Sequence, residues 1–458
     1  MCSKIPDDVR ETLIKAKQCR DDGDLVHAEE LYRKAIDQHP HSPNPFNNLA
    51  AVIVQQGRTE EAVPFFQKAI ELKPDFAAAH SNLASSYKTL ERFGEALDHA
   101  RFALEADPEL ADAYNNMGAT MFELCYYEEA QGFYQIGLGK NPALAAMHTN
   151  YALLLMTLEK YELGWKHYEW RAGIQREMPR PLWRGEDLQG KTILLWTEQG
   201  LGDSIQFIRL AKLLKELGAN IILECQAPLC SLMQEIEWVD RAVEQTGQVP
   251  PFHVHCPLLS LGERFNVRLD RNPVETPYLS VDQDRIGHWR SLIEHTASDT
   301  RLRVGFTWAG NPKHLNDKNR STTLENFVDL TLAHPDIQFY SVQKPTDEQR
   351  IQLADQPAIV DLGGEFNDFS DTAAALSSLD LVIGVDSAVI HLAGGLARPC
   401  WALLPYRSDW RWLLERSDSP WYPNMRLFRQ PERKDWQSVF REVERELANY
   451  VQTTKLKH

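Results

Sequence analysis

The side chains best suited to chemistry lie in residues 381–404, where a strand pattern runs directly into a helix pattern. The apolar run before Asp386 is typical of a strand buried on both faces, and the residues after Ser387 favour a helix. A helix that begins at the carboxyl end of a parallel strand directs its free N–H groups and its dipole towards a ligand, which favours an anion. His391 falls on the same face of this helix as Ser387. The alternative is that Ser387 only caps the helix and that His391 is a core histidine.

Two other loops at predicted strand ends add charge. The strand pattern at 192–197 is followed by a turn that contains two glycines and Asp203, and then by a helix pattern at 204–217. Further on, the loop 309–320 is basic, and the strand pattern at 337–342 ends in a glutamine and a lysine. Cations and N–H groups stabilise a departing diphosphate, and a carboxylate can take a proton from an acceptor hydroxyl. The three loops together predict transfer from a donor that has a charged leaving group.

Composition narrows the class of protein. The chain has 458 residues and a net charge of −16, which argues against non-specific nucleic-acid binding because that needs a basic face. No apolar run has the length of a membrane span, and the N-terminus lacks the apolar core of a signal peptide. The seven cysteines include no CxxC pair, so neither a disulfide framework nor a structural zinc site is expected. These features predict a cytoplasmic protein.

An internal repeat of 34 residues dominates the first third of the chain. The columns that keep this spacing are Pro40, Pro74, Pro108 and Pro142, then Ala28, Ala62, Ala96 and Ala130, and finally Asn48, Asn82, Asn116 and Asn150. The period and its small residues resemble the tetratricopeptide repeat, in which each unit is a pair of helices. Four full repeats and a degenerate fifth predict a helical solenoid over residues 1–178.

The asparagine column falls on the first helix of each repeat, on the surface that becomes concave in a solenoid. An amide side chain can both donate to and accept from a peptide backbone, so the four asparagines predict a groove for an extended polypeptide. A similar asparagine ladder occurs in O-GlcNAc transferases. The alternative is that these side chains bond neighbouring helices to one another.

After a linker rich in proline and glycine, strand and helix patterns alternate to the end of the chain. Alternation of this kind predicts parallel sheets covered by helices. We expect two Rossmann-like lobes, at 179–281 and 282–458, with a cleft between them. The predicted fold class is thus an α-helical solenoid followed by an α/β pair of lobes.

Two motifs carry a resemblance to a known family. Residues 193–219 (ILLWTEQGLGDSIQFIRLAKLLKELGA) resemble the opening of heptosyltransferase-type glycosyltransferases of family 9. Residues 382–404 (VIGVDSAVIHLAGGLARPCWALL) resemble the nucleotide-diphosphate site of that family. The whole chain looks like bacterial tetratricopeptide proteins with such a domain, in which the segment 410–430 recurs, and its architecture is similar to O-GlcNAc transferases and tetratricopeptide flagellin glycosyltransferases. The resemblance implies a GT-B fold that binds its donor in the C-terminal lobe and its acceptor in the N-terminal lobe and needs no metal.

The resemblance also implies roles for particular residues. Asp203 would be the general base, although the same position suits a helix cap. The residues that would contact the donor or its diphosphate are Gly200, Gly202, Lys318, Arg320, Gln343, Lys344, Asp386, Ser387, Ala388, Val389 and His391. The chain departs from the family at Ala388, where glycine is usual, and at Gln206, where histidine is usual. Its N-terminal lobe is also short, which argues against a lipopolysaccharide acceptor.

The sequence therefore predicts a metal-independent inverting glycosyltransferase. Its partners would be a nucleotide sugar, whose base and sugar stay open, and a polypeptide acceptor held by the solenoid. One alternative is a non-catalytic scaffold that keeps the fold and binds proteins through its repeats. Another is a transferase that acts on lipopolysaccharide or polysaccharide.

Overall fold

The computed structural model describes residues 7–270, 274–296, 302–314 and 316–455. The chain divides into two compact units, residues 1–154 and 155–458, and each unit is described by itself. The first unit is helical, and the second contains two parallel sheets with helices around them. A helical solenoid followed by a region of parallel sheets and helices is thereby confirmed, whereas the domain boundaries at 178 and 281 stay predictions.

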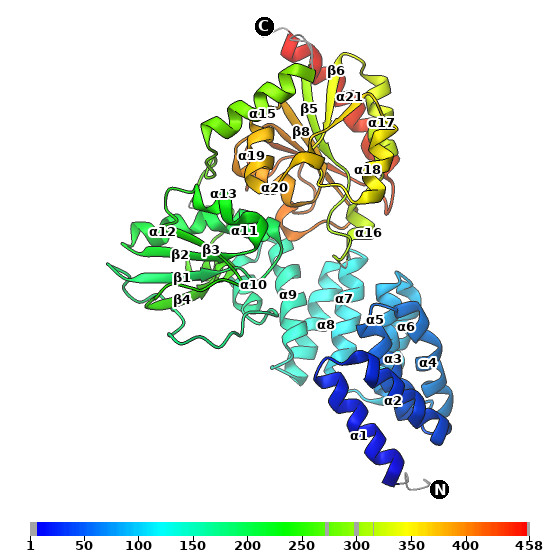
Figure 1. The fold of residues 1–458 in the computed structure, drawn as a ribbon. Coiled ribbons are helices and arrows are strands. Elements are labelled where there is room, and N and C mark those ends of the chain that lie inside the picture. The colour runs from blue at the N-terminus through cyan, green and yellow to red at the C-terminus, as the bar shows by residue number, and fades with distance from the viewer. Residues whose placement is uncertain (1–6, 271–273, 297–301, 315, 456–458) are drawn as a thin grey trace. The chain divides into compact units, whose positions relative to one another are not determined.

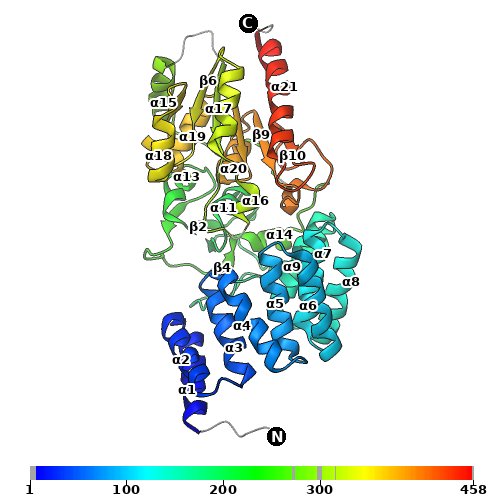
Figure 2. The same ribbon diagram turned by 90° about the vertical axis from the view of Figure 1, so that its right-hand side faces the viewer.

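The first unit is a stack of antiparallel helix pairs, which are seen side by side in Figure 2. Its helices are α1 (Asp7–Asp21), α2 (Leu25–Gln38), α3 (Pro43–Gln55), α4 (Thr59–Leu72), α5 (Ala77–Thr89), α6 (Phe93–Ala106), α7 (Ala111–Glu123), α8 (Tyr127–Lys140) and the beginning of α9 (Ala145–Thr157). The small residues of the repeat allow the two helices of a pair to cross closely. A Cβ atom on Gly118 would lie only 2.8 Å from the ring of Tyr134, which is fully buried.

The turn inside each helix pair needs a left-handed backbone. Positive φ angles recur every 34 residues, at Gly23 (83°), Gly57 (81°), Glu91 (61°), Cys125 (64°) and Glu159 (59°). Glycine adopts this conformation without steric cost, whereas other residues lose about 1–2 kcal/mol. The first two repeats therefore use glycine at this turn, and the later ones accept strain there.

The second unit begins with a four-stranded parallel sheet in the order β3-β2-β1-β4. Its elements are α10 (Tyr161–Tyr168), β1 (Thr192–Trp196), α11 (Leu201–Phe207), α12 (Ala211–Glu216), β2 (Asn220–Cys225), α13 (Cys230–Gln234), β3 (Arg241–Glu244), β4 (Val254–Pro257) and α14 (Leu261–Arg264). Strand β1 is central and buried, because its residues Ile193 to Trp196 are apolar on both faces.

A six-stranded parallel sheet follows, in the order β10-β9-β8-β5-β6-β7. Its elements are α15 (Gln283–Thr296), β5 (Leu302–Thr307), α16 (Asp317–Arg320), α17 (Leu324–Ala333), β6 (Ile337–Ser341), α18 (Asp347–Ala354), β7 (Ile359–Asp361), α19 (Phe369–Ser377), β8 (Leu381–Val385), α20 (Ala388–Gly395), β9 (Cys400–Leu404), β10 (Met425–Arg429) and α21 (Trp436–Lys455). Helices α17 and α21 pack on one face, where Phe327 and Phe440 meet Phe306 and Phe428 of the sheet in one apolar core. Helices α15 and α19 lie on the other face (Figure 1).

The strands predicted at 192–197, at 337–342 and before Asp386 all form, within a residue of the expected bounds. The predicted helix at 204–217 differs, because α11 begins earlier, at Leu201, and a short 3-10 turn separates it from α12. Strand β10 and helices α18 and α21 lie outside the predicted pattern. The two sheets matter for function because neighbouring parallel strands end at the same edge of a sheet. The loop after β1 or β5 therefore lies beside the loop after a neighbouring strand.

The recurring left-handed turn gives a test of the solenoid. We expect Gly57→Ala to lower the free energy of unfolding by about 1 kcal/mol, since alanine must adopt a left-handed φ of 81° there. The matched control is Gly132→Ala inside α8, which should raise it by roughly 0.5–1 kcal/mol. A Cβ atom at either position has no neighbour within 4 Å, so only the backbone differs. Urea unfolding followed by circular dichroism measures both, and a change of the same sign in the two variants would contradict this account.

Candidate functional site

Two strand-to-helix turns from the two sheets meet inside the second unit. Helix α11 follows β1 after the turn 197–200, and α20 follows β8 after Asp386 and Ser387. The contact is tight, because a Cβ atom on Gly202 would lie 2.7 Å from Cδ2 of His391 and 3.6 Å from Cα of Ala388. The glycine that the sequence assigned to diphosphate binding thus allows the two helices to approach each other.

Asp203 lies at this contact with both carboxylate oxygens engaged. Its Oδ2 accepts the backbone N–H of Gly200 at 2.9 Å, so Asp203 caps α11 as the third residue of the helix, whereas the N-cap position itself belongs to Gly200. Its Oδ1 accepts a hydrogen bond from Nη2 of Arg411 at 2.5 Å. The side chain keeps 24% of its surface exposed, so a small molecule can still reach the carboxylate.

Arg411 belongs to a short 3-10 turn, η5 (Trp410–Trp412), that follows β9. Its guanidinium is buried and donates to Asp203, to Oδ1 of Asp409 at 2.8 Å and to Oε1 of Gln206. Burial alone would lower the pKa of Arg411, but the carboxylates of Asp409 and Asp203 outweigh burial and raise it. This cation is therefore permanently charged and links α11 to the segment after β9.

His391 and Asp386 form the other half of the contact. Nδ1 of His391 lies 2.9 Å from the hydroxyl of Tyr422, Nε2 lies 3.9 Å from Oδ1 of Asp386, and the ring stacks on Trp412 at 5.3 Å. Burial, together with Arg411 and two other arginines, lowers the pKa of His391 well below its usual value, so the imidazole is neutral. Burial and the charge of Asp409 raise the pKa of Asp386 to about 6.

Ser387 occupies the predicted N-cap position of α20, but its hydroxyl makes no capping hydrogen bond. Its Oγ is buried and has no hydrogen-bond partner among the residues that the structure describes. A buried hydroxyl without a partner is costly unless a ligand completes it. Ala388 and Val389, the first residues of α20, are partly exposed beside it. The first turn of α20 is therefore open to a polar ligand.

The predicted cations occupy different places. Arg320 is partly buried against Gly310 and pairs with Asp317 at 3.3 Å, and its charge acts on both His391 and Asp386. Lys318 lies on the same short helix, α16, and is exposed. Arg320 is therefore close enough to the site for its charge to act there, and Lys318 is an exposed cation of the same helix.

Gln343 and Lys344 are tied within the protein. Oε1 of Gln343 accepts the backbone N–H groups of Trp308 at 3.1 Å and Ala309 at 2.9 Å, and also the hydroxyl of Thr307. The ammonium group of Lys344 donates to the carbonyl of Phe366. The side-chain oxygen of Gln343 thus holds the start of the basic loop, which is a positioning role and differs from the expected contact with the donor.

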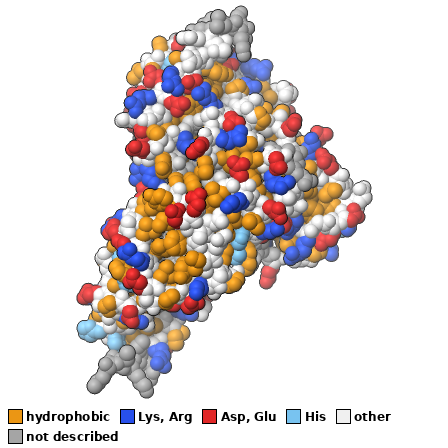
Figure 3. All heavy atoms as spheres, turned by 180° about the vertical axis from the view of Figure 1, so that it is seen from behind, with side chains coloured by type: hydrophobic (Ala, Val, Ile, Leu, Met, Phe, Trp, Pro, Cys, Tyr) orange, Lys and Arg blue, Asp and Glu red, His pale blue; other side chains and the backbone are white. Residues whose placement is uncertain are grey.

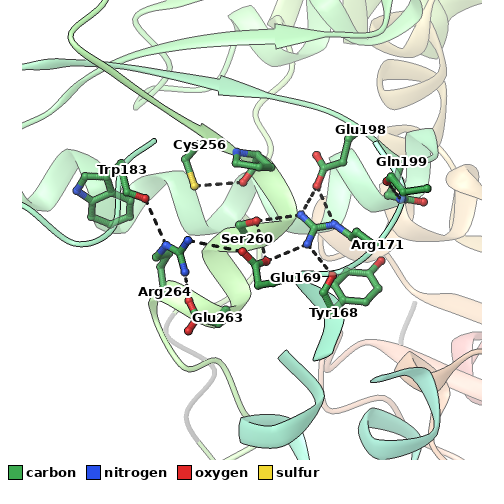
Figure 4. Close-up of polar contacts among 12 residues, drawn as sticks. Tyr168, Glu169, Arg171, Trp183, Glu198, Gln199, Cys256, Ser260, Glu263 and Arg264 are labelled. Atoms are coloured by element: carbon green, nitrogen blue, oxygen red, sulfur yellow. Dashed lines mark hydrogen bonds and ion pairs between the residues drawn. The ribbon is translucent and has the colours of Figure 1, made fainter. Parts of the chain in front are cut away.

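A buried ion network holds the turn before Asp203 from the other side (Figure 4). Arg171 pairs with Glu198 at 2.5 Å and with Glu169 at 2.9 Å, and it donates to the hydroxyl of Ser260 at 3.0 Å. Burial raises the pKa of Glu198 although the neighbouring Arg171 acts to lower it. The ion pair therefore offsets the cost of burying its two charges only because the groups are in direct contact. The segment after α10 thereby fixes the turn that presents Asp203.

Several site residues escaped prediction: Asp409, Arg411, Trp412, Tyr422 and Arg209. The first four lie in or beside the tryptophan-rich segment 410–430. Arg209 is buried over the rings of Tyr278 and Tyr422 and donates to the carbonyl of Trp421 at 3.1 Å. The density of aromatic residues and arginine in 410–430 was the available signal.

The asparagine column of the first unit bonds one repeat to the next. The side-chain amides of Asn82, Asn116 and Asn150 donate to Asn47, Ser81 and Asn115, each 35 residues earlier, at 2.9, 2.8 and 3.0 Å. Inter-repeat bonding, the alternative weighed above, thus accounts for their donor groups. Asn116 is buried, whereas Asn48, Asn82 and Asn150 are partly exposed. A role in peptide binding stays a prediction and would use chiefly the carbonyl oxygens of Asn82 and Asn150, because that of Asn48 accepts a hydrogen bond from the side chain of Asn47 at 3.3 Å.

Three features of the described residues bear on what the protein can bind. Within residues 7–455, apart from the gaps given above, no cluster of three or more His, Cys, Asp or Glu side chains is arranged to hold a metal ion. Nor does that part of the chain contain a helix with the length and apolar character of a membrane span. On the face drawn in Figure 3, lysine and arginine side chains lie among acidic ones.

Comparison with known proteins identifies the repeats. Residues 52–91 match the TPR repeat family. Protein FlbA of Caulobacter vibrioides is 26% identical over 323 residues, which cover 63% of this chain and 52% of FlbA, so the match spans about half of that relative.

Solved structures similar to this chain include a thermophilic TPR protein of Thermus thermophilus (17% identity, 35% of this chain and 88% of that one, TM-score 0.33). They also include PilF of Pseudomonas aeruginosa (18%, 46% and 88%, TM-score 0.35) and a tetratricopeptide repeat protein of Parabacteroides merdae (23%, 36% and 66%, TM-score 0.30). The N-terminal region of the chain thus contains tetratricopeptide repeats, matched at residues 52–91.

The raised pKa of Asp386 predicts a pH-dependent cost to folding. Its folded pKa of about 6 lies above the ordinary value of 3.8. The protonated carboxyl therefore contributes its full share to the free energy of unfolding below pH 3.8, and this share is lost as the pH rises to about 6. We expect Asp386→Asn to be more stable than wild type above pH 6, by up to about 3 kcal/mol at 1.36 kcal/mol per pKa unit, and to show no such gain below pH 3.8.

Urea unfolding at the two pH values measures this difference. The control is Asp418→Asn, because Asp418 is an exposed acid whose pKa is lowered by its hydrogen bond to Arg416. It should gain no stability at either pH. If Asp386→Asn gained the same free energy of unfolding at both pH values, the surroundings would not raise the pKa of Asp386.

Proposed function

We propose that the second unit is an inverting glycosyltransferase of the GT-B type, which uses a nucleotide-activated sugar. The observation that carries the proposal is the order of the six-stranded sheet. Read from β7 to β10, it is the order of a doubly wound nucleotide-binding sheet, and the order reverses between β5 and β8. Ligands bind at such a reversal, and here the loop with Arg320 follows β5 while Asp386 and Ser387 follow β8.

The donor diphosphate would lie at the first turn of α20. The free N–H groups of that turn, the Ser387 hydroxyl and the Arg320 guanidinium all favour an anion there. When Tyr422 donates its hydroxyl hydrogen to Nδ1 of His391, Nε2 of the neutral ring carries the proton and can donate it to a phosphate oxygen. Lys318, on the same helix as Arg320, adds positive charge.

The acceptor hydroxyl would approach from the side of α11. Its oxygen attacks the anomeric carbon and forms the new glycosidic bond, while the bond from that carbon to the diphosphate breaks. Asp203 takes the hydroxyl proton, and the diphosphate leaves with the electron pair. A single displacement from the side opposite the leaving group inverts the anomeric centre.

We infer a polypeptide acceptor because the chain joins this unit to tetratricopeptide repeats, which are a protein-binding architecture. The partly exposed amides of Asn82 and Asn150 still offer carbonyl oxygens to a peptide backbone. The alternative of a non-catalytic scaffold shares the repeats and differs in having no nucleotide-sugar site.

Thermal unfolding with a panel of nucleotide sugars tests the proposal directly. A ligand that binds only the folded state at about 100 times its Kd adds about 2.7 kcal/mol of stability. We expect one class of nucleotide sugar to raise the Tm and the other classes to leave it unchanged. A flat response to every donor would favour the scaffold.

Replacing the proposed base separates chemistry from binding. Asp203→Asn should still bind the donor but should lower turnover by roughly 10²–10⁴-fold, which is the usual contribution of a positioned base. Asp284→Asn, an exposed acid at the start of α15, is the matched control and should turn over like wild type. A chelator should leave the rate unchanged. Full turnover by Asp203→Asn would reduce this residue to a helix cap.

The asparagine column gives a test of the acceptor. Replacing Asn48, Asn82, Asn116 and Asn150 by alanine should lower glycosylation of a protein acceptor while donor hydrolysis stays unchanged, because water needs no groove. The expected loss is about 0.5–1.5 kcal/mol of binding for each hydrogen bond removed.

Because these amides also join the repeats, a second variant is needed as the control. The triple variant Asn47→Ala, Ser81→Ala and Asn115→Ala removes the inter-repeat partner side chains and keeps the column itself. It should glycosylate protein like wild type. An equal loss in both variants would assign the asparagines to packing.

A further inference from the structure

Arg411 holds Asp203 in a way that conflicts with the work of a base. Of the five N–H groups of a guanidinium, one bonds Asp203, one bonds Asp409 and one bonds Gln206. The Arg411 bond occupies Oδ1 of Asp203, and the Gly200 N–H occupies Oδ2. Each carboxylate oxygen keeps a second lone pair, but while Arg411 stays bonded its positive charge opposes the arrival of a proton on Oδ1.

The geometry points to Arg411 as an exchangeable ligand: it binds Asp203 when the donor is absent and transfers to the donor diphosphate when the donor arrives, which releases Asp203 to act as the base. This inference rests on the proposed glycosyltransferase function. It assigns a binding and charge-neutralising role to a residue of the segment 410–430, outside both family motifs.

Arg411 lies within reach of the proposed diphosphate position. Trp412, the next residue, stacks on His391 at 5.3 Å, and His391 projects from the first turns of α20. Asp203, which bonds the guanidinium, follows Gly202 in the chain, and a Cβ atom on Gly202 would lie 2.7 Å from the same histidine ring. The guanidinium therefore lies at the junction between α11 and the amino end of α20.

A diphosphate is a stronger partner for this cation than one carboxylate oxygen. It carries more negative charge, and the planar fork of arginine matches two phosphate oxygens at once. Asp409, the other acid bonded to Arg411, holds Nη1 at 2.8 Å, so the planar guanidinium would pivot about this bond in the exchange. The guanidinium also lies over the ring of Trp410 at 4.4 Å, which supports its plane.

The exchange places charge where the reaction needs it. The glycosidic bond forms, the bond from the anomeric carbon to the diphosphate breaks, and the electron pair leaves with the diphosphate. Arg411 meets that added negative charge, while the proton of the acceptor hydroxyl goes to the oxygen of Asp203 that Arg411 has vacated.

Calorimetric titration of the full chain with nucleoside monophosphates and diphosphates tests this assignment. The probes are UMP and UDP, GMP and GDP, AMP and ADP, and CMP and CDP. For the base that binds, the measured quantity is the ratio of the Kd of the monophosphate to the Kd of the diphosphate, which is the preference for diphosphate. In Arg411→Ala this preference should fall roughly tenfold or more, since a hydrogen bond to a charged group contributes about 1.5–3 kcal/mol. Arg416→Ala, an exposed arginine of the same segment that pairs with Asp418, should keep the wild-type preference.

Asp203→Asn gives a result of opposite sign. Without the carboxylate charge as competitor, Arg411 is available to the ligand, so the diphosphate should bind more tightly than to wild type while the monophosphate should not. A merely structural ion pair would produce no such gain. This variant also carries the test if thermal melting shows that Arg411→Ala does not fold.

Three outcomes would overturn the inference. An unchanged preference in Arg411→Ala means that this residue does not touch the second phosphate. No gain in Asp203→Asn means that the two partners do not compete. Failure of wild type to bind any of the nucleotides removes the donor site itself, and the role of Arg411 with it, which distinguishes that failure from the first two.

Discussion

The close approach of α11 to α20 is the contact on which the candidate site depends. Gly202 makes it possible, because a Cβ atom there would lie 2.7 Å from the His391 ring. A larger residue would separate the two helices and move Asp203 away from Arg411. The contact also brings together loops from two different sheets. A site built in this way can assemble only when both sheets have formed and packed against each other.

Charge is balanced closely within this contact. The acids Asp203, Asp386 and Asp409 face Arg411, and Arg209 and Arg320 lie nearby. Burial makes each unpaired charge costly, so the neutral His391 and the raised pKa of Asp386 are both consequences of the same low-dielectric surroundings. Of the described polar groups near α20, the Ser387 hydroxyl is buried without a hydrogen-bond partner. The proposed anion site at the first turn of α20 rests on this hydroxyl and on the nearby arginines.

One column of residues holds the repeats in register. The side-chain amides of Asn82, Asn116 and Asn150 donate to the preceding repeat, and Asn82 and Asn150 stay partly exposed. The left-handed turn inside each pair shows a compromise between backbone strain and packing. Glycine at 23 and 57 adopts it freely, whereas Glu91 and Cys125 accept strain because the packing of the pair demands the same backbone.

The sequence by itself determined the features that local spacing encodes. The 34-residue period predicted the helix pairs, the apolar runs predicted the strands, and the turns with Asp203 and with Asp386 and Ser387 were recognisable because each lies directly at a strand end. Only the tertiary structure decided which distant residues meet. Asp203 and Arg411 are 208 positions apart, so no local pattern relates them. The same holds for the strand order of each sheet and for the use of Gln343 to hold the basic loop. The physical reason is that periodicity reports contacts along a helix or strand, whereas burial and ion pairing between sheets are settled by how whole elements pack.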